Sequence, residues 1–191
     1  MERKKFLLLT DLDGTFEGSA KDFKPLANFI TSFETKNNCE VIIHFVSGAS
    51  KERIFNQIKF LEKNNKTIFN HIDPTLIDSN FENSSSPFVH QVQQYKAKKI
   101  EDFLRYHGKI KIAGLCYMGD NLLNMDKSAF QCIPFYKNSF PLGAYSIMPD
   151  CNSGANRKGV DFYSPKKNIL GCIDCLNQMS KKIELSKGTG R

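Results

Sequence analysis

The sequence predicts an α/β fold in which helices flank a parallel β-sheet and no large second domain is inserted. Short apolar runs alternate along the chain with stretches whose apolar residues recur at helical spacing. This alternation is typical of parallel strands joined by helical crossovers. Several apolar runs also end in short polar segments, the first of them at residues 11–15. Ligands of open α/β sheets bind beyond the carboxyl ends of the strands, so we expect a functional site at these segments.

The first part of the chain has the clearest elements. Residues 6–10 are a short apolar run that leads into a Gly-containing turn, which predicts a buried strand. Residues 26–33 carry apolar side chains at i, i+3, i+4 and i+7, which predicts an amphipathic helix. The same reasoning predicts a second strand at 41–46, a second helix at 54–61 and a third strand at 67–72.

The later elements are separated from the first ones by a polar stretch. Residues 73–91 contain Asp73-Pro74 and a run of Asn and Ser, and predict a loop insertion near the edge that carries the site. The pattern beyond it predicts a helix at 95–104 and strands at 112–118, 131–135 and 145–148.

The end of the chain is predicted to be helical. Ser164-Pro165 has the form of an N-cap followed by Pro in the first turn, and Ile169 to Met179 supply one apolar face. Residues 186–191 are expected to be a flexible tail. We therefore expect a single domain over residues 1–185.

The composition limits the class of protein. The chain has 191 residues, 40% of them hydrophobic, which is enough for a core of its own. No apolar run approaches the ~20 residues of a membrane-spanning helix, and the one after residues 3–5 is too short for a cleavable signal. The net charge of +7 comes mostly from dispersed lysines. Such dispersion is typical of a solvated surface and not of a nucleic-acid-binding face, and it favours an anionic substrate.

The six cysteines indicate a reducing compartment. Cys116 and Cys132 fall in apolar runs and are expected to be small buried hydrophobic residues. Cys172 and Cys175 form a single CxxC, whereas a zinc site needs four ligands, so we assign no metal to them. We expect a cytoplasmic protein, with a secreted effector that has no cleavable signal as the alternative. The sequence leaves the oligomeric state open.

Polar groups follow several predicted strands at ends that converge on one edge of the sheet. Asp11 and Asp13 follow the first strand, Ser47 and Gly48 the second, and Asp120 a later one. Carboxylates from two strands make an oxygen-rich pocket suited to Mg²⁺. A hydroxyl, backbone N–H groups and a lysine ammonium suit a phosphate dianion. A carboxylate that faces such a phosphate can attack phosphorus and form an aspartyl-phosphate.

In this order, the motifs resemble the signature of the haloacid dehalogenase (HAD) superfamily. That signature is a DxDGT strand end, a Ser or Thr after the second strand, a Lys, and a Gly-Asp motif. Here the matching segments are residues 11–15, 45–49, 96–100 and 119–124, spread over much of the chain. The resemblance implies a Rossmann-like sheet and a Mg²⁺-dependent phosphomonoester hydrolase with an aspartyl-phosphate intermediate.

The resemblance also implies a role for each matched residue. Asp11 is the expected nucleophile and a Mg²⁺ ligand. Asp13 is the expected general acid and base, and its backbone carbonyl is expected to bind the metal. Ser47 and the Gly48 N–H are expected to hold the phosphoryl group, and Asp120 to bind Mg²⁺.

A lysine is expected to neutralise charge on the phosphate and on Asp11. A cation is needed because a carboxylate can approach a dianionic phosphate only where positive charge screens the repulsion between them. Lys96 fits the family spacing to Ile100 and is preferred, with Lys98 and Lys99 as the competing choices.

Two further assignments concern the metal. The family commonly has a second Asp where this chain has Asn124, which still offers an oxygen to the metal or its waters. Asp126 is offset from that position and is expected to face solvent. Among the histidines, His44 is expected to be a core or edge residue. The remaining ones lack the mutual spacing of a metal site, although His90 lies near the expected substrate edge: His71, His90 and His107.

The spacing of the motifs bears on the substrate. The residues between Asp11 and Ser47 suffice for one helix and two strand ends and leave no room for a helical cap domain. Between Ser47 and Lys96, only residues 73–91 are not needed for a helix and a strand. Family members with such capless or minimally capped sites accept large phosphorylated substrates. The resemblance therefore implies a phosphoprotein substrate, with phosphotyrosine and phosphoserine/threonine both open. The alternatives are a small-metabolite phosphatase, acting on a sugar phosphate or nucleotide, and a catalytically weak phospho-binding module.

Overall fold

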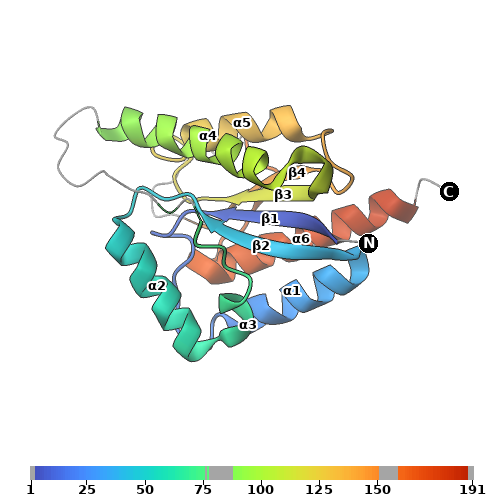
Figure 1. Cartoon of the computed structure of the whole chain (residues 1–191), viewed down its shortest axis with the longest axis horizontal. Helices are drawn as coiled ribbons and strands as arrows, with labels where there is room; N and C mark the ends of the chain where they lie inside the picture. Colours follow the sequence, from blue (N-terminus) through green and yellow to red (C-terminus); the bar gives the residue numbers. More distant parts are fainter. Residues whose placement is uncertain (1–2, 76, 78–87, 151–158, 189–191) are drawn as a thin grey trace.

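A computed structural model describes residues 3–75, 77, 88–150 and 159–188 and shows a parallel five-stranded sheet between two layers of helices (Figure 1). The strands lie in the order β2-β1-β3-β4-β5, and every neighbouring pair is parallel. Their bounds are β1 (Lys4–Thr10), β2 (Cys39–Phe45), β3 (Ile112–Met118), β4 (Ala144–Met148) and β5 (Phe162–Tyr163). The α/β, Rossmann-like fold class is thus confirmed.

The strand order reverses at β1. From β1 the chain crosses to β2 on one side, and it later returns to place β3 on the other side. In parallel α/β sheets a crevice opens at such a switch point, beyond the carboxyl ends of the two strands that flank it. The topology therefore places a ligand site where β1 and β3 end.

Helices cover both faces of the sheet (Figure 1). One layer holds α1 (Lys24–Asn37), α2 (Lys51–Asn64), α3 (Lys66–Phe69) and α6 (Asn168–Gly188), and the other holds α4 (Phe88–His107) and α5 (Lys127–Cys132). Successive side chains of β1 point to opposite faces of the sheet, so β1 packs against both helix layers. Phe6 and Leu8 join the core against α1 and α6, whereas Leu7 and Leu9 join the core against α4. No helix among the described residues combines the length and the apolar character needed to cross a bilayer.

Most predicted elements are confirmed with small changes of boundary. The strands expected at 6–10, 41–46, 112–118 and 145–148 and the helices expected at 26–33, 54–61 and 95–104 are all present. Of the predicted loop 73–91, residues 88–91 are the first turn of α4, and residues 76 and 78–87 lie outside the described part of the chain.

Two predicted strands are wrong. At 67–72 the Asn65 side chain accepts a hydrogen bond from the Ile68 N–H and starts the short helix α3, so only Ile72 reaches the sheet, as one isolated parallel bridge to Ile43. Residues 131–135 belong to α5 and to a 3-10 helix, η2 (Ile133–Tyr136). Pro134 has no N–H for a strand ladder but is tolerated in the first turn of a helix.

The last helix also differs from the prediction at both ends. Ser164 accepts a hydrogen bond from the Lys166 N–H and donates one to Asp174, which makes a turn ahead of the helix, and α6 begins only at Asn168. At the other end α6 continues to Gly188. Residues 186–188 are therefore helical, and only 189–191 of the predicted tail lie outside the described residues.

Candidate functional site

Asp11 is fixed at the end of the central strand. Its N–H donates to the Met118 carbonyl oxygen at 2.8 Å, so the β1–β3 ladder extends one residue past β1. The side chain is only 6% exposed. One carboxylate oxygen, Oδ1, accepts from the Leu12 N–H at 2.8 Å, and the other, Oδ2, accepts from Lys96 Nζ at 2.7 Å. The sheet thus delivers a buried, oriented carboxylate to the switch point.

Lys96 is the lysine that enters this site. It projects from α4, is 1% exposed, and forms ion pairs with Asp11 at 2.7 Å and with Asp126 at 2.5 Å. The two competing lysines are placed differently, since Lys98 is exposed and Lys99 lies over the Tyr95 ring. Although burial lowers the pKa of Lys96, the charges of Asp126 and Asp11 outweigh it and raise that pKa above its usual value.

The turn after β3 supplies two more carboxylates, Asp120 and Asp126. The expectation that Asp126 faces solvent is wrong, because its side chain is fully buried. Asp126 accepts hydrogen bonds from Lys96, from the Tyr117 hydroxyl and from the Asn121 N–H. Asn124 is exposed and is held through its backbone, with its N–H donating to the Asn121 side chain. Asp126, and not Asn124, therefore occupies the buried position beside Lys96.

The three carboxylates leave the site with excess negative charge. One oxygen of each of Asp11, Asp120 and Asp126 lies within 4.8 Å of the others, and Lys96 forms ion pairs with two of them, Asp11 and Asp126. Burial raises the pKa of Asp11 to about 6, against the opposing charge of Lys96. Burial and the charges of Asp126 and Asp11 raise the pKa of Asp120 to about 7. An all-oxygen donor set with unbalanced negative charge fits a hard divalent cation such as Mg²⁺.

Asp13 lies at the solvent side of this cluster. It pairs with Arg53 of α2, at 3.0 Å from Nη1 to Oδ2 and 2.5 Å from Nη2 to Oδ1, and both side chains are about half exposed. Glu17 lies 3.6 Å from the same guanidinium. Sequence reasoning missed Arg53, although its place in the first turn of the helix after Ser47-Gly48 is a usable signal for an anion-facing residue.

Ser47 lies next to Asp11 at the end of β2. Its side chain is buried, and its Oγ accepts from the Ala49 N–H at 3.1 Å. A hydrogen bond between Ser47 and Asp11 opposes part of the rise that burial causes in the pKa of Asp11. Gly48 follows it in close contact with α4, where a Cβ would lie 3.1 Å from a Val92 methyl group. The structure thus gathers Ser47, Lys96, Asp120 and Asp126 around Asp11, with Asp13 turned toward Arg53.

Gly14 is required by the shape of the site. It has a φ of +69°, and a Cβ there would lie 2.2 Å from Asp120 Oδ2. We therefore expect Gly14→Ala to displace the Asp120 carboxylate and to strain the turn by about 1–2 kcal/mol. Chemical denaturation should show that loss, and calorimetry should show weakened Mg²⁺ binding. Gly108→Ala is a matched control, because its φ is +73° but nothing lies within 4 Å of a Cβ there. Unchanged Mg²⁺ affinity in Gly14→Ala would contradict this account of the site.

The comparisons with known proteins add little. No protein-family model and no curated protein matches the sequence. A crystal structure of Thermoplasma acidophilum 0175 aligns over 97% of this chain and 99% of its own, with 16% identity and a TM-score of 0.45. A likeness this weak identifies neither a family nor a function for this chain.

Proposed function

We propose that this protein is a Mg²⁺-dependent phosphomonoester hydrolase of the HAD type that works through an aspartyl-phosphate on Asp11. The observation that carries the proposal is the buried Asp11 carboxylate, held by Lys96 beside Asp120 and Asp126 at the switch point of the sheet. Asp11, Lys96 and Asp120 are also residues of the motifs that resemble the HAD signature.

The metal would be held by Asp11 and Asp120, with Asp126 beside them and the Asp13 carbonyl as the further ligand that the family resemblance suggests. When bound, Mg²⁺ supplies positive charge that screens the phosphate from the carboxylates. Lys96 contributes to the same screening, and its ion pairs fix the orientation of the Asp11 carboxylate. Ser47 and the Gly48 N–H would bind the phosphoryl oxygens.

In the first step an Asp11 oxygen forms a bond to phosphorus while the bond to the leaving oxygen breaks. Asp13 donates a proton to that leaving oxygen. In the second step Asp13 takes a proton from water, whose oxygen bonds to phosphorus as the Asp11–phosphorus bond breaks. Inorganic phosphate leaves, and both aspartates return to their starting forms. Asp13 has to move from its pairing with Arg53 for these transfers, and its half-exposed side chain has room to do so.

We propose a phosphoprotein as the substrate. In the described ranges, the connections from β1 to α1, from β2 to α2 and from β3 to α5 contain no further helix or strand that could build a cap domain. The net charge of +7 favours an anionic partner. The test is a panel of phosphotyrosine and phosphoserine/threonine peptides, sugar phosphates and nucleotides, assayed with Mg²⁺ and with EDTA. Asp11→Asn serves as the blank.

Three results of that panel are informative. Mg²⁺-dependent turnover that is fastest on phosphopeptides supports the whole proposal. Turnover confined to sugar phosphates or nucleotides contradicts the substrate half and favours the small-metabolite alternative. Binding of phosphopeptides without turnover of any compound overturns the enzymatic proposal and favours a phospho-binding module.

The role of Asp13 is tested separately from binding. We expect Asp13→Asn to lower kcat by about 10²–10⁴-fold, because an amide cannot transfer a proton to the leaving oxygen. The affinity for inorganic phosphate, measured by calorimetry, should change little. Glu17→Gln is the matched control, since Glu17 faces the same guanidinium, no proposed step uses it, and the new amide keeps an oxygen that can accept from the Gly14 N–H. Equal kcat values for Asp13→Asn and the unaltered chain would refute the acid–base assignment.

A further inference from the structure

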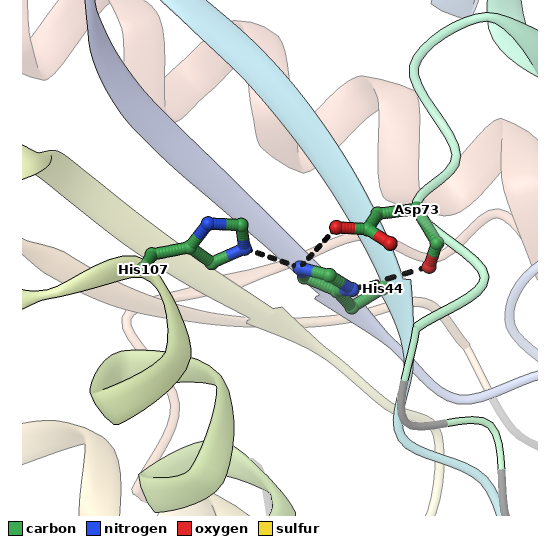
Figure 2. Close-up of side chains that lie close together, drawn as sticks. All are labelled: His44, Asp73 and His107. Carbon is green, nitrogen blue, oxygen red and sulfur yellow. Dashed lines mark hydrogen bonds and ion pairs between the residues drawn. The ribbon is translucent and has the colours of Figure 1, made fainter.

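A second group of metal-binding side chains lies away from the carboxylate site, where three segments meet (Figure 2). His44 comes from β2, Asp73 from the segment after α3, and His107 from the last residue of α4. One ligand atom of each lies within 4.8 Å of the others. Along α4 about three turns, roughly 16 Å, separate His107 from Lys96, so the two sites are distinct.

The hydrogen bonds of His44 determine which of its ring nitrogens carries the hydrogen. Its Nδ1 lies 3.2 Å from the Asp73 backbone carbonyl oxygen, which can only accept, so Nδ1 carries the hydrogen. Nε2 therefore has a lone pair, which accepts a hydrogen bond from the His107 Nε2–H at 2.7 Å (Figure 2). A metal ion that replaced this hydrogen would take both Nε2 atoms as ligands, with the hydrogen of His107 on its Nδ1. Proteins hold metal-binding histidines in this way, with one ring nitrogen donating to a carbonyl and the other left for the metal.

The surroundings hold this arrangement in place. The His44 ring stacks on Phe103 with 4.0 Å between centroids, and both histidines are buried. The Asp73 carboxylate points at His44 Nε2 from 3.9 Å, beyond hydrogen-bond distance (Figure 2). Two buried imidazoles thus lie beside a carboxylate whose Oδ2 is too far from His44 Nε2 to accept a hydrogen bond from it.

We propose that His44, Asp73 and His107 form a binding site for a borderline divalent transition metal ion, represented by Zn²⁺. Two imidazole nitrogens and one carboxylate oxygen match the donors that Zn²⁺ takes, and differ from the all-oxygen set around Asp11. With Zn–N bonds of about 2.0–2.1 Å in a tetrahedral site, the two Nε2 atoms would separate by roughly half an ångström. The carboxylate would move inward by a similar amount. The partly exposed Asp73 side leaves room for water as the fourth ligand.

Such an ion would join three parts of the fold. It would cross-link the edge strand β2 and the segment after α3 to the end of α4. The chain between Asp73 and His107 would then form a loop whose two ends bind the same ion. Cross-links that close long stretches restrict the unfolded chain and stabilise the folded one. The same ion would fix the far end of the helix that carries Lys96. The expected role is therefore structural.

The test uses the full chain, stripped of metal with a chelator and dialysed into buffer containing Mg²⁺. Calorimetry should show one equivalent of Zn²⁺ bound with a micromolar or lower Kd. Thermal unfolding at a hundredfold excess over Kd should shift upward by roughly 5–10 °C. His107→Gln, placed at a helix end and checked for folding by circular dichroism, should weaken binding at least about 100-fold. Asp73→Asn should also weaken it.

Two controls locate the ion. His71→Gln should bind Zn²⁺ normally, because His71 contacts the Thr67 carbonyl and Glu34 instead. Asp120→Asn should also bind normally, because it alters only the carboxylate site. Absence of Zn²⁺ binding by the unaltered chain overturns the proposal and leaves the two histidines as a hydrogen-bonded pair. Full binding by His107→Gln, or loss of binding in Asp120→Asn, also overturns it.

Discussion

Replacing Asp11 by Asn is expected to abolish phosphomonoester hydrolysis, with kcat lower by at least about 10⁴-fold. The amide has the size of the carboxylate but cannot form the bond to phosphorus. The fold should persist, because Lys96 keeps its ion pair with Asp126. The measurements are Mg²⁺-dependent hydrolysis of a chromogenic aryl phosphate and trapping of the acid-stable phosphoenzyme after quenching.

The control for Asp11→Asn is Asp102→Asn. Asp102 lies on α4, pairs with Arg105 at 3.8 Å and has no part in the proposed chemistry, so its replacement should leave kcat unchanged. Comparable turnover by Asp11→Asn and the unaltered chain would refute the nucleophile assignment. Phosphoenzyme that still forms in Asp11→Asn would assign the covalent step to another residue.

Lys96→Met should have the largest effect on stability, a loss of about 3–5 kcal/mol in the free energy of unfolding. Methionine fills much of the same space but leaves Asp11 and Asp126 buried without their cation. Urea denaturation in metal-free buffer measures the loss. Hydrolysis should fall as well, because the screening of the phosphate is reduced.

Two companion variants separate charge from packing at Lys96. Lys98→Met removes a charge from the exposed side of the same helix and should change stability by no more than about 0.5 kcal/mol. The double change Lys96→Met with Asp126→Asn removes one of the unpaired carboxylates and should recover part of the lost stability. A double variant no more stable than Lys96→Met would show that packing, and not charge, causes the loss.

The carboxyl ends of the strands were the most predictable part of the site. The apolar period of β1 and β3 fixes where each strand ends, and parallel pairing then brings Asp11 and Asp120 to one edge. Lys96 was preferred because its spacing to Ile100 matches the family that the motifs resemble, and both side chains are buried on α4. Local patterns of one or two turns are sufficient for these residues.

Features set by tertiary contacts were not predictable. Asp126 is buried because the turn after β3 folds back, so that the Asp126 N–H donates to the Asn121 carbonyl oxygen. No periodic pattern in the sequence predicts such a turn. The apolar run at 67–72 has strand-like composition, yet it begins as a helix because the Asn65 side chain caps its first turn. His44 and His107 meet across more than sixty positions of sequence, which spacing within a motif does not reveal.

The position of β1 between β2 and β3 has a consequence for synthesis of the chain. Ribosomal elongation releases β1 and β2 early, but the second edge of β1 has no partner until β3 emerges. Asp126 is synthesised still later. A nascent or truncated chain that ends before Asp126 therefore lacks part of the sheet and one of the two carboxylates that pair with Lys96. Fragments of the N-terminal half should therefore be inactive and prone to aggregation through that open edge.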